Sequence, residues 1–427
     1  VLDFRHTPTA QIIPTMTLET KFATTKAAIM GYGTIGSGVY EVLDKNCKSV
    51  EKKAGEPIEV KYILDLREFP GSPVEKLVMH DVEQIVNDPE IGIVVETMGG
   101  TKPAYEFVRR CLLAGKHVVT SNKALVAAHG TELIRIAAEK NISFLFEASV
   151  GGGIPIIRPL VESLGGEEIL EISGILNGTT NYILTKMNEE GWSFEEALKR
   201  AQELGYAERN PEADIEGYDT CRKIAILTAV ATGKEVNYEE IPTQGITKIT
   251  SMDSSYAAHM GAAIKLFGTS VNKDGKIYLE VVPVLVDAKD PLYAVTDVFN
   301  GILVVGNMLG ASMFYGSGAG KLPTASAVVG DMISAVRFGD EPEKIGWSSE
   351  KLEVHPAAEL SRKYFARFEG SERAKKEAVA AAFGDVKFVT LEGTDEFAVL
   401  TGEMTGGEFD SAAAKVGGLR QKIAARL

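Results

Sequence analysis

A glycine-rich segment, Gly31-Tyr32-Gly33-Thr34-Ile35-Gly36-Ser37-Gly38, follows a short apolar run at residues 27–30. This order predicts a strand, a tight turn and the start of a helix. In such turns Gly31 would permit the turn, Gly33 would let a pyrophosphate approach the backbone, and Gly36 would let helix and strand pack closely. The helix N-terminus would then face the anion. The segment predicts dinucleotide binding, and an ordinary glycine-rich turn is the alternative.

Beyond this segment, short apolar runs alternate with amphipathic stretches. Strands are expected at residues 27–30, 60–64, 91–95, 117–120 and 143–146, and helices at 105–114 and 131–140. Such alternation is typical of βαβ units. We therefore expect an α/β fold with a doubly wound, parallel Rossmann sheet over residues 26–147, where the dinucleotide would bind.

The pattern changes after Ser149. A strand at 169–175, several helices to residue 233, strand signal at 277–286 and an apolar helix at 325–336 predict one α+β domain, residues 148–340. Residues 339–351 are polar, contain Pro342 and are expected to form a linker.

The remaining residues, 352–427, predict a small α+β module. Its strands are expected at 364–368, 387–391 and 397–402, and its helices at 372–383 and 411–427. At the other end, residues 1–25 begin with Val and lack the basic and apolar regions of a secretory signal. They are treated as an N-terminal tail of unknown origin.

Composition narrows the classes of function. The 427 residues are 45% hydrophobic and carry a net charge of −14, a sign that disfavours nucleic acid as a partner. No apolar run approaches the ~18 residues that a membrane span needs. Cys47, Cys111 and Cys221 are too widely spaced for a disulfide framework or a Cys-x-x-Cys motif, which favours a reducing, cytoplasmic location.

The choice between NAD and NADP stays open. Asp65 is the acidic candidate at the end of the strand at 60–64, where it would accept from a ribose 2′-hydroxyl and favour NAD. Arg67 could instead receive a 2′-phosphate and favour NADP. A solvated loop without either role is a third reading.

Two other strand ends are candidate ligand positions. The segment Glu96-Thr97-Met98-Gly99-Gly100 ends one strand and Ser121-Asn122-Lys123 ends the next. Ligands bind at the carboxyl edge of doubly wound sheets, so Gly99 is a candidate cofactor contact. Lys123 could hold a substrate oxygen near the nicotinamide, or it could be an exposed loop charge.

The segment 201–223 is the most informative about chemistry. Asp219 can cap the helix that follows, and it shares a helix face with Lys223 four residues later. An exposed ion pair is one reading. However, residues 224–230 are apolar nearly all round, so the helix is expected to be buried and Lys223 to need acidic partners or a ligand. With Glu208 and Asp214, these residues could grip a substrate ammonium while the lysine moves a proton.

Residues 201–223 resemble the homoserine dehydrogenase family through the pattern Ala-x3-Gly-aromatic-small-x2-Asn-Pro-x2-Asp-aliphatic-x-Gly-x-Asp-x3-Lys. The resemblance covers roughly residues 26–340. It also includes the segments 31–38, 121–126, 147–155, 174–181 and 314–320.

The resemblance implies reversible reduction of L-aspartate 4-semialdehyde to L-homoserine by NADH or NADPH, in the biosynthesis of threonine, methionine and isoleucine. It implies that Lys223 donates a proton to the aldehyde oxygen and that Lys123 is a second active-site lysine. Asp219 would be catalytic and would also hold the substrate, together with Glu208, Asp214 and Thr179. The cofactor would contact Thr34, Ile35 and Gly318, the last from the segment 316–336 returning to the cofactor site.

The resemblance also implies a monovalent cation, sodium, in the loop that follows residue 146. Its ligands would be the carboxylate of Glu147 and the main-chain carbonyls of Val150, Gly152 and Ile154, an all-oxygen set that suits a hard cation. A glycine-rich structural loop is the alternative.

The C-terminal module resembles the ACT fold, which many family members use for threonine feedback inhibition. Its first loop, residues 369–373, lacks the usual Pro-Gly-Val-Leu kind of turn, and a final helix is expected where that fold has a fourth strand.

These features together predict an enzyme that acts on a small-molecule substrate as a homodimer or higher homo-oligomer. A reductase of another small aldehyde is an alternative, because a fold does not fix a substrate. A non-catalytic nucleotide and amino-acid sensor is another, although Lys123 and Lys223 are both present.

Overall fold

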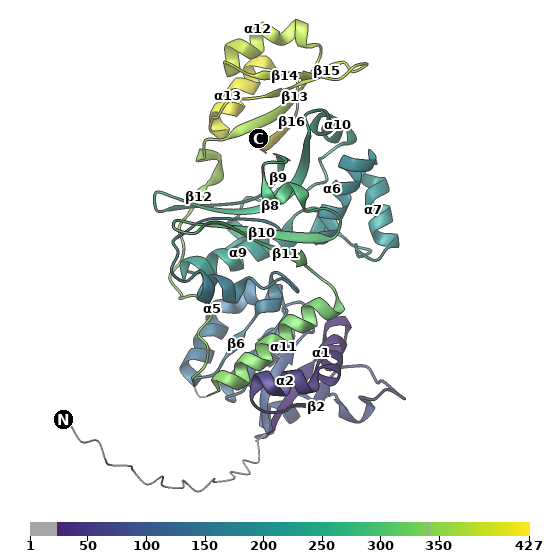
Figure 1. Cartoon of the computed structure of the whole chain (residues 1–427), viewed down its shortest axis with the longest axis vertical. Coiled ribbons are helices and arrows are strands. Elements are labelled where there is room, and N and C mark those ends of the chain that lie inside the picture. Colours follow the sequence, from purple (N-terminus) through teal and green to yellow (C-terminus); the bar gives the residue numbers. More distant parts are fainter. Residues whose placement is uncertain (1–23, 340) are drawn as a thin grey trace, which may run out of the picture.

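The computed structural model describes residues 24–339 and 341–427. The chain forms three parts in sequence order, stacked along the long axis of the molecule (Figure 1). The expected tail therefore lies, apart from its last two residues, outside the described residues. No helix among the described residues has both the length and the apolar character to cross a membrane.

The first part is a six-stranded parallel sheet in the order β3-β2-β1-β4-β5-β6. Its strands are β1 (Thr25–Met30), β2 (Ile58–Leu64), β3 (Val78–Met79), β4 (Ile91–Glu96), β5 (His117–Thr120) and β6 (Phe144–Leu145). The strand order reverses between β1 and β4, which is the position where doubly wound sheets bind ligands. The expectation of a parallel Rossmann-type sheet is confirmed.

Helices connect these strands. They are α1 (Thr34–Lys45), α2 (Cys47–Ala54), α3 (Val82–Asn87), α4 (Ala104–Leu113) and α5 (Lys123–Lys140). The last of them begins where the side chain of Asn122 accepts from the main-chain N–H of Leu125, which satisfies one of the free donors at a helix start. This cap places Lys123 in the first helical position.

The second part adds a mixed sheet. Its strands are β7 (Ile169–Ile175), β8 (Ala262–Lys273), β9 (Lys276–Asp287), β10 (Phe299–Gly306) and β11 (Gly310–Ser317). Its helices are α6 (Gly178–Glu190), α7 (Phe194–Glu203), α8 (Glu212–Ile215), α9 (Tyr218–Thr232), α10 (Ser251–His259) and α11 (Lys321–Phe338). Helix α11 returns to the first part and packs beside α1 (Figure 1).

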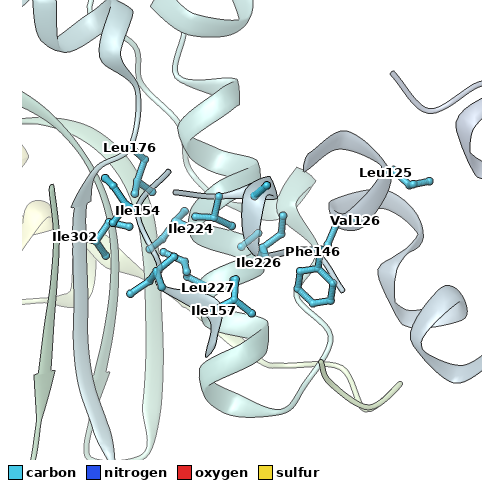
Figure 2. Close-up of a cluster of buried hydrophobic side chains, with 14 of the residues drawn as sticks. Leu125, Val126, Phe146, Ile154, Ile157, Leu176, Ile224, Ile226, Leu227 and Ile302 are labelled. Atoms are coloured by element: carbon cyan, nitrogen blue, oxygen red, sulfur yellow. The ribbon is translucent and has the colours of Figure 1, made fainter. Parts of the chain in front are cut away.

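Helix α9 lies in the apolar core of this part (Figure 2). Ile224, Ile226 and Leu227 are at most 1% exposed and lie among side chains of both parts of the chain. Burial on nearly every side explains why this helix carries so little polar surface, as its sequence indicated. The polar residues of its first turn are therefore held inside the protein.

The C-terminal module has the order β13 (Lys363–Glu369), α12 (Glu372–Phe383), β14 (Lys387–Thr390), β15 (Glu396–Leu400), α13 (Gly406–Val416) and β16 (Leu419–Arg426). This is a βαββαβ unit. The expectation of a helix over 411–427 is wrong, because α13 ends at Val416 and β16 follows. Pairing of β16 with β13 on one side and with β9 on the other overrides the helix-forming composition of its residues.

The module continues the sheet of the second part. The two form one ten-stranded sheet in the order β11-β10-β7-β8-β9-β16-β13-β15-β14, with the short strand β12 (Val354–Pro356) also paired to β9.

The segment expected to be a linker, residues 339–351, packs on α5, where the indole N–H of Trp347 donates to Thr131 at 2.9 Å.

A buried arginine joins the module to the second part. Arg367, only 8% exposed, donates from Nε to Oδ1 of Asp253 in α10 at 3.0 Å and pairs with Glu396 at 2.6 Å. Asp253 is fully buried and also accepts from Gln421 at 3.2 Å. The ion pair therefore ties α10 to two strands of the module.

We expect Arg367→Ala to lower the free energy of unfolding by about 3 kcal/mol, because it leaves Asp253 buried without its cation. Chemical denaturation measures the change. Arg420→Ala is the matched control: Arg420 is 55% exposed and pairs with Glu369 on the surface, so its loss should have no measurable effect. Equal stability of the two variants would contradict the importance of the Arg367 ion pair.

Candidate active site

The glycine-rich turn between β1 and α1 has the close packing that its sequence suggests. Gly31 has φ of 94°, a conformation that favours glycine. A Cβ on Gly36 would lie 2.0 Å from the carbonyl oxygen of Gly31, whereas a Cβ on Gly33 would meet nothing within 4 Å. Gly36 is therefore needed for the packing of helix and turn, and Gly33 borders open space.

Asp65 and Arg67 meet at the edge of this turn. Asp65 accepts from the N–H of Tyr32 at 2.7 Å and from Nε and Nη2 of Arg67 at 2.9 Å each. The Arg67 side chain is 60% exposed and also donates to the carbonyl of Tyr32 at 3.0 Å. The side-chain hydrogen bond from Arg67 lowers the pKa of Asp65. Both carboxylate oxygens of Asp65 are thus engaged, and the guanidinium is presented to solvent.

Helix α9 begins after Gly217, not after Asp219. Gly217 is the N-cap residue, with φ of 84°, and Asp219 lies inside the first turn, so the expectation that Asp219 caps the helix is wrong. A glycine is suited to this position because its backbone takes the left-handed conformation. Asp219 is free to point its carboxylate at two lysines.

Asp219 forms ion pairs with both candidate lysines. Its Oδ1 lies 2.6 Å from Nζ of Lys123, and its Oδ2 lies 2.9 Å from Nζ of Lys223. Nζ of Lys223 also donates to the carbonyl of Leu176 at 2.6 Å. The Asp219 side chain is 3% exposed, that of Lys223 9% and that of Lys123 42%. We call these three residues the lysine–aspartate triad; Lys123 is its solvent-facing member.

The triad shifts the pKa values of its members in different directions. Burial alone would raise the pKa of Asp219, but the charges of Lys223 and Lys123 outweigh it and hold this pKa below its ordinary value. The charge of Asp219 raises the pKa of Lys123. Burial lowers the pKa of Lys223 despite the same carboxylate.

Asn177 connects the triad to Asp214. Its Nδ2 donates to Oδ1 of Asp214 at 2.7 Å and to Oδ2 of Asp219 at 2.9 Å, while its Oδ1 accepts from the N–H of Thr180 and caps α6. Burial, followed by the charge of Asp219, raises the pKa of Asp214. Sequence analysis did not single out Asn177, although its place directly after β7 was a usable signal.

Two expected substrate residues lie outside this network. Glu208 is exposed, and its main-chain carbonyl accepts from Gln202 at 3.2 Å. Thr179 is 8% exposed, and its hydroxyl donates to the carbonyl of Tyr206 at 2.7 Å. The structure therefore brings together Lys123, Lys223, Asp214 and Asp219, and it leaves the Glu208 side chain toward solvent.

The loop expected to hold a cation is tightly built. Glu147 is buried, and its carboxylate accepts from the N–H groups of Ile156 at 2.6 Å, Ile157 at 2.8 Å and Arg158 at 2.9 Å. A carboxylate offers about four acceptor positions, so one remains beyond these three N–H groups, and Nη1 of Arg158 lies 4.0 Å from Oε2. Among the described residues no group of three or more His, Cys, Asp or Glu side chains is arranged to hold a metal, so a cation here would depend on carbonyl ligands.

Gly318 packs against this loop. A Cβ on Gly152 would lie 2.3 Å from the carbonyl oxygen of Gly318, and a Cβ on Gly318 would lie 1.9 Å from Nδ2 of Asn300. Any larger residue at either position would collide with these atoms, so close packing alone explains why both residues are glycine. The segment after β11 is held beside the loop and then enters α11.

The sheet reverses its strand order between β1 and β4, its glycine turn is open at Gly33, and Lys123 at its carboxyl edge shares Asp219 with the buried Lys223. These features define a nicotinamide-dependent oxidoreductase. Two family models match, homoserine dehydrogenase NAD binding domain over residues 31–147 and homoserine dehydrogenase over residues 155–333. The chain belongs to the homoserine dehydrogenase family and is an NAD(P)-dependent oxidoreductase.

Comparison with individual relatives also supports membership of this family. The chain is 43% identical to a homoserine dehydrogenase of Synechocystis over 81% of this chain and 83% of that one, and 39% identical to one of Bacillus subtilis over 73% of each. A crystal structure of a homoserine dehydrogenase from Thiobacillus denitrificans superposes with a TM-score of 0.83 at 32% identity, covering 94% of this chain and 98% of that one. A hyperthermophilic archaeal homoserine dehydrogenase in complex with NADPH superposes with a TM-score of 0.62 at 28% identity, covering 73% and 97%.

We expect Gly33→Ala and Gly36→Ala to separate cofactor binding from folding. Gly33→Ala should leave the free energy of unfolding nearly unchanged, because its Cβ meets nothing, and should weaken dinucleotide binding by about tenfold or more, because the Cβ occupies the space at the helix N-terminus. Gly36→Ala should cost about 1–3 kcal/mol of stability through its contact with the Gly31 carbonyl. Calorimetric titration and denaturation measure the two effects, and unimpaired binding in Gly33→Ala would contradict this location of the cofactor.

Proposed function

We propose that the chain catalyses the reversible reduction of L-aspartate 4-semialdehyde to L-homoserine with NADPH or NADH. The observation that carries the proposal is the lysine–aspartate triad, in which one buried carboxylate holds two lysines next to the carboxyl edge of the Rossmann sheet. Reduction of an aldehyde requires a hydride, which the nicotinamide cofactor supplies, and a proton for the oxygen. A buried lysine with a lowered pKa is suited to deliver that proton.

In this mechanism Lys223 donates its proton to the aldehyde oxygen, and in the reverse direction its neutral amine accepts the proton of the hydroxyl. Asp219 keeps the ammonium in place and offsets the cost of burying it. Lys123, which remains charged beside Asp219, lies between cofactor and substrate and stabilises negative charge on the oxygen.

The substrate ammonium would bind the acidic side of the site. Asp214 is held toward Asp219 by Asn177, and Thr179 lines the neighbouring loop. By the family resemblance Glu208, which is exposed on the loop after α7, would also hold the amino acid. The cofactor would contact Gly31, Gly33, Thr34, Ile35, Gly36 and Gly99, with Gly318 on the returning segment. The functional units are then residues 26–147, 148–340 and 352–427.

The geometry at Asp65 supports NADP as the preferred cofactor. Asp65 uses both oxygens on Tyr32 and Arg67, so it is less able to accept from a ribose hydroxyl. The guanidinium of Arg67 uses Nε and Nη2 on Asp65 and is exposed, so its Nη1 could donate to a 2′-phosphate.

Two further properties belong to the proposal. The remaining acceptor position of Glu147, with the carbonyls of Val150, Gly152 and Ile154, would hold a sodium-like cation that stiffens the loop after β6. An ACT-like fold for residues 352–427 is supported by the βαββαβ order. Threonine inhibition would follow from the family resemblance, and unchanged activity at millimolar threonine would remove it.

A homodimer would associate through the edge of the ten-stranded sheet that β11 forms. This edge strand alternates exposed and half-buried residues, and Tyr315 is 55% exposed and stacks on Phe299. Met308 and Leu309 in the preceding turn are 81% and 60% exposed. An unpaired edge strand with exposed apolar side chains favours association with a second copy, which sedimentation of the purified protein measures.

The direct test is oxidation of L-homoserine at alkaline pH, followed through absorbance of the reduced cofactor, in parallel with NADP and with NAD. We expect activity with both and a lower KM for NADP. If folded protein binds a dinucleotide and oxidises no homoserine, another small aldehyde is the substrate.

We expect Lys223→Ala to lower kcat by ~10² to 10⁴ while cofactor binding stays unchanged, because a positioned acid contributes about that much. The native enzyme should lose reductive activity as pH rises through the pKa of Lys223, which burial places below that of a free lysine, and oxidative activity should rise over the same range. Lys234→Ala, which removes an exposed lysine just beyond the other end of α9, is the control. Near-native turnover of Lys223→Ala would exclude Lys223 as the proton donor.

A further inference from the structure

A fully buried carboxylate lies at the end of β4. Glu96 is 0% exposed. Its Oε1 accepts from the N–H of Met98 at 2.8 Å, the N–H of Gly99 at 3.4 Å and Nδ2 of Asn122 at 3.4 Å. Its Oε2 accepts from the hydroxyl of Thr120 at 2.6 Å. One side chain therefore connects the loops that follow two neighbouring strands.

The directions of these hydrogen bonds fit an ionised Glu96. The Thr120 hydroxyl accepts from the N–H of Asn122 at 2.9 Å, so its own proton is directed to Glu96. Two main-chain N–H groups and an amide NH₂ can only donate. Burial raises the pKa of Glu96 above its ordinary value, and all four hydrogen bonds reduce this rise without cancelling it.

The charge of Glu96 is not matched by a cation. No described residue forms an ion pair with Glu96, in contrast to Asp219 and Asp253, which are equally buried and each have a basic partner. A buried anion without a cationic partner lowers the free energy of unfolding, because it has lost its hydration without gaining an opposite charge. Binding of a positively charged ligand nearby would offset part of that cost.

Glu96 lies where the cofactor must pass. It is paired in register with Met30, the residue before the glycine turn, and with Thr120 on the other side. The strand order reverses between β1 and β4, and a dinucleotide crosses the sheet edge there. Gly99, held by Glu96, has φ of 77° and open space around its Cβ position. Asn122, also held by Glu96, precedes Lys123, so Glu96 lies toward the reacting half of the crevice.

We propose that the negative charge of Glu96 makes the cleft bind the oxidised nicotinamide cofactor, whose ring is cationic, in preference to the reduced cofactor, whose ring is neutral. Glu96 acts by its charge and by holding the loops at 97–100 and 121–122, and it touches no reacting atom, so it is a positioning residue. The same charge favours the departure of hydride, because positive charge then develops on the ring. The inference rests on the cofactor crevice of the proposed function.

The test measures dissociation constants of NADP and NADPH by calorimetric titration, without substrate. We expect Glu96→Gln, which keeps the shape and removes the charge, to raise the ratio of the oxidised to the reduced constant by roughly tenfold, the order that one unit charge produces inside a protein. Thr120→Val is the matched control: it removes one hydrogen bond from the same carboxylate and leaves the charge, so both constants should change by the same factor. Glu96→Asp retains the charge and should keep a ratio close to that of the native protein.

An unchanged ratio in folded Glu96→Gln, or equal changes in both constants as in Thr120→Val, would overturn the proposal and leave Glu96 a structural role alone. If Glu96→Gln does not fold, Glu96→Asn, which also removes the charge and keeps an acceptor for these donors, must show the same change of ratio relative to Glu96→Asp. Because no substrate is present, failure of homoserine oxidation would refute the proposed reaction without changing this result.

Discussion

The ion pairs of Asp219 are the interaction on which the site depends. A carboxylate that is 3% exposed is stable only with compensating charge and hydrogen bonds, and Asp219 has two lysines and the amide of Asn177. Lys123 begins α5 of the first part, and Lys223 is in α9 of the second. The carboxylate thus ties α5 of the cofactor-binding part to α9 of the second part.

Local backbone choices place these three side chains. Asn122 caps α5 so that Lys123 projects from the first turn, and Gly217 starts α9 so that Asp219 lies inside it. The apolar sides of α9 are buried in a continuous core, which prevents the helix from rotating to expose Lys223 (Figure 2). Helix α11 then brings residues far along the sequence back against α1, where Gly38 allows an approach that a Cβ would block at 2.8 Å from the carbonyl of Lys321.

Much of this was predictable from sequence, for physical reasons. Buried parallel strands are short apolar runs, so five of the six strands of the first sheet were predicted, and a lysine ahead of an apolar helix pointed to a buried charge. The two-residue strand β3 was missed because it is too short to show a pattern. The strand β16 was not predictable in this way: its residues Leu419–Arg426 favour a helix locally, and only pairing with β9 and β13 makes them a strand. Asn177 was missed because its two carboxylate partners are 37 and 42 residues away.

One carboxylate shared by two lysines also divides their chemical roles. Attraction to Asp219 raises the pKa of both, but only Lys223 is buried enough for desolvation to reverse the sign. Pairs of titratable groups whose surroundings separate their pKa values are typical of acid and base assignments in enzymes. Lys123 therefore keeps its positive charge through the working pH range and is suited to stabilise an oxyanion, whereas Lys223 can lose and regain a proton. Loss of the Asp219 carboxylate would lower the pKa of both lysines, and it would lower that of Lys223 furthest below the ordinary value, since burial would then act on it without the opposing charge of Asp219.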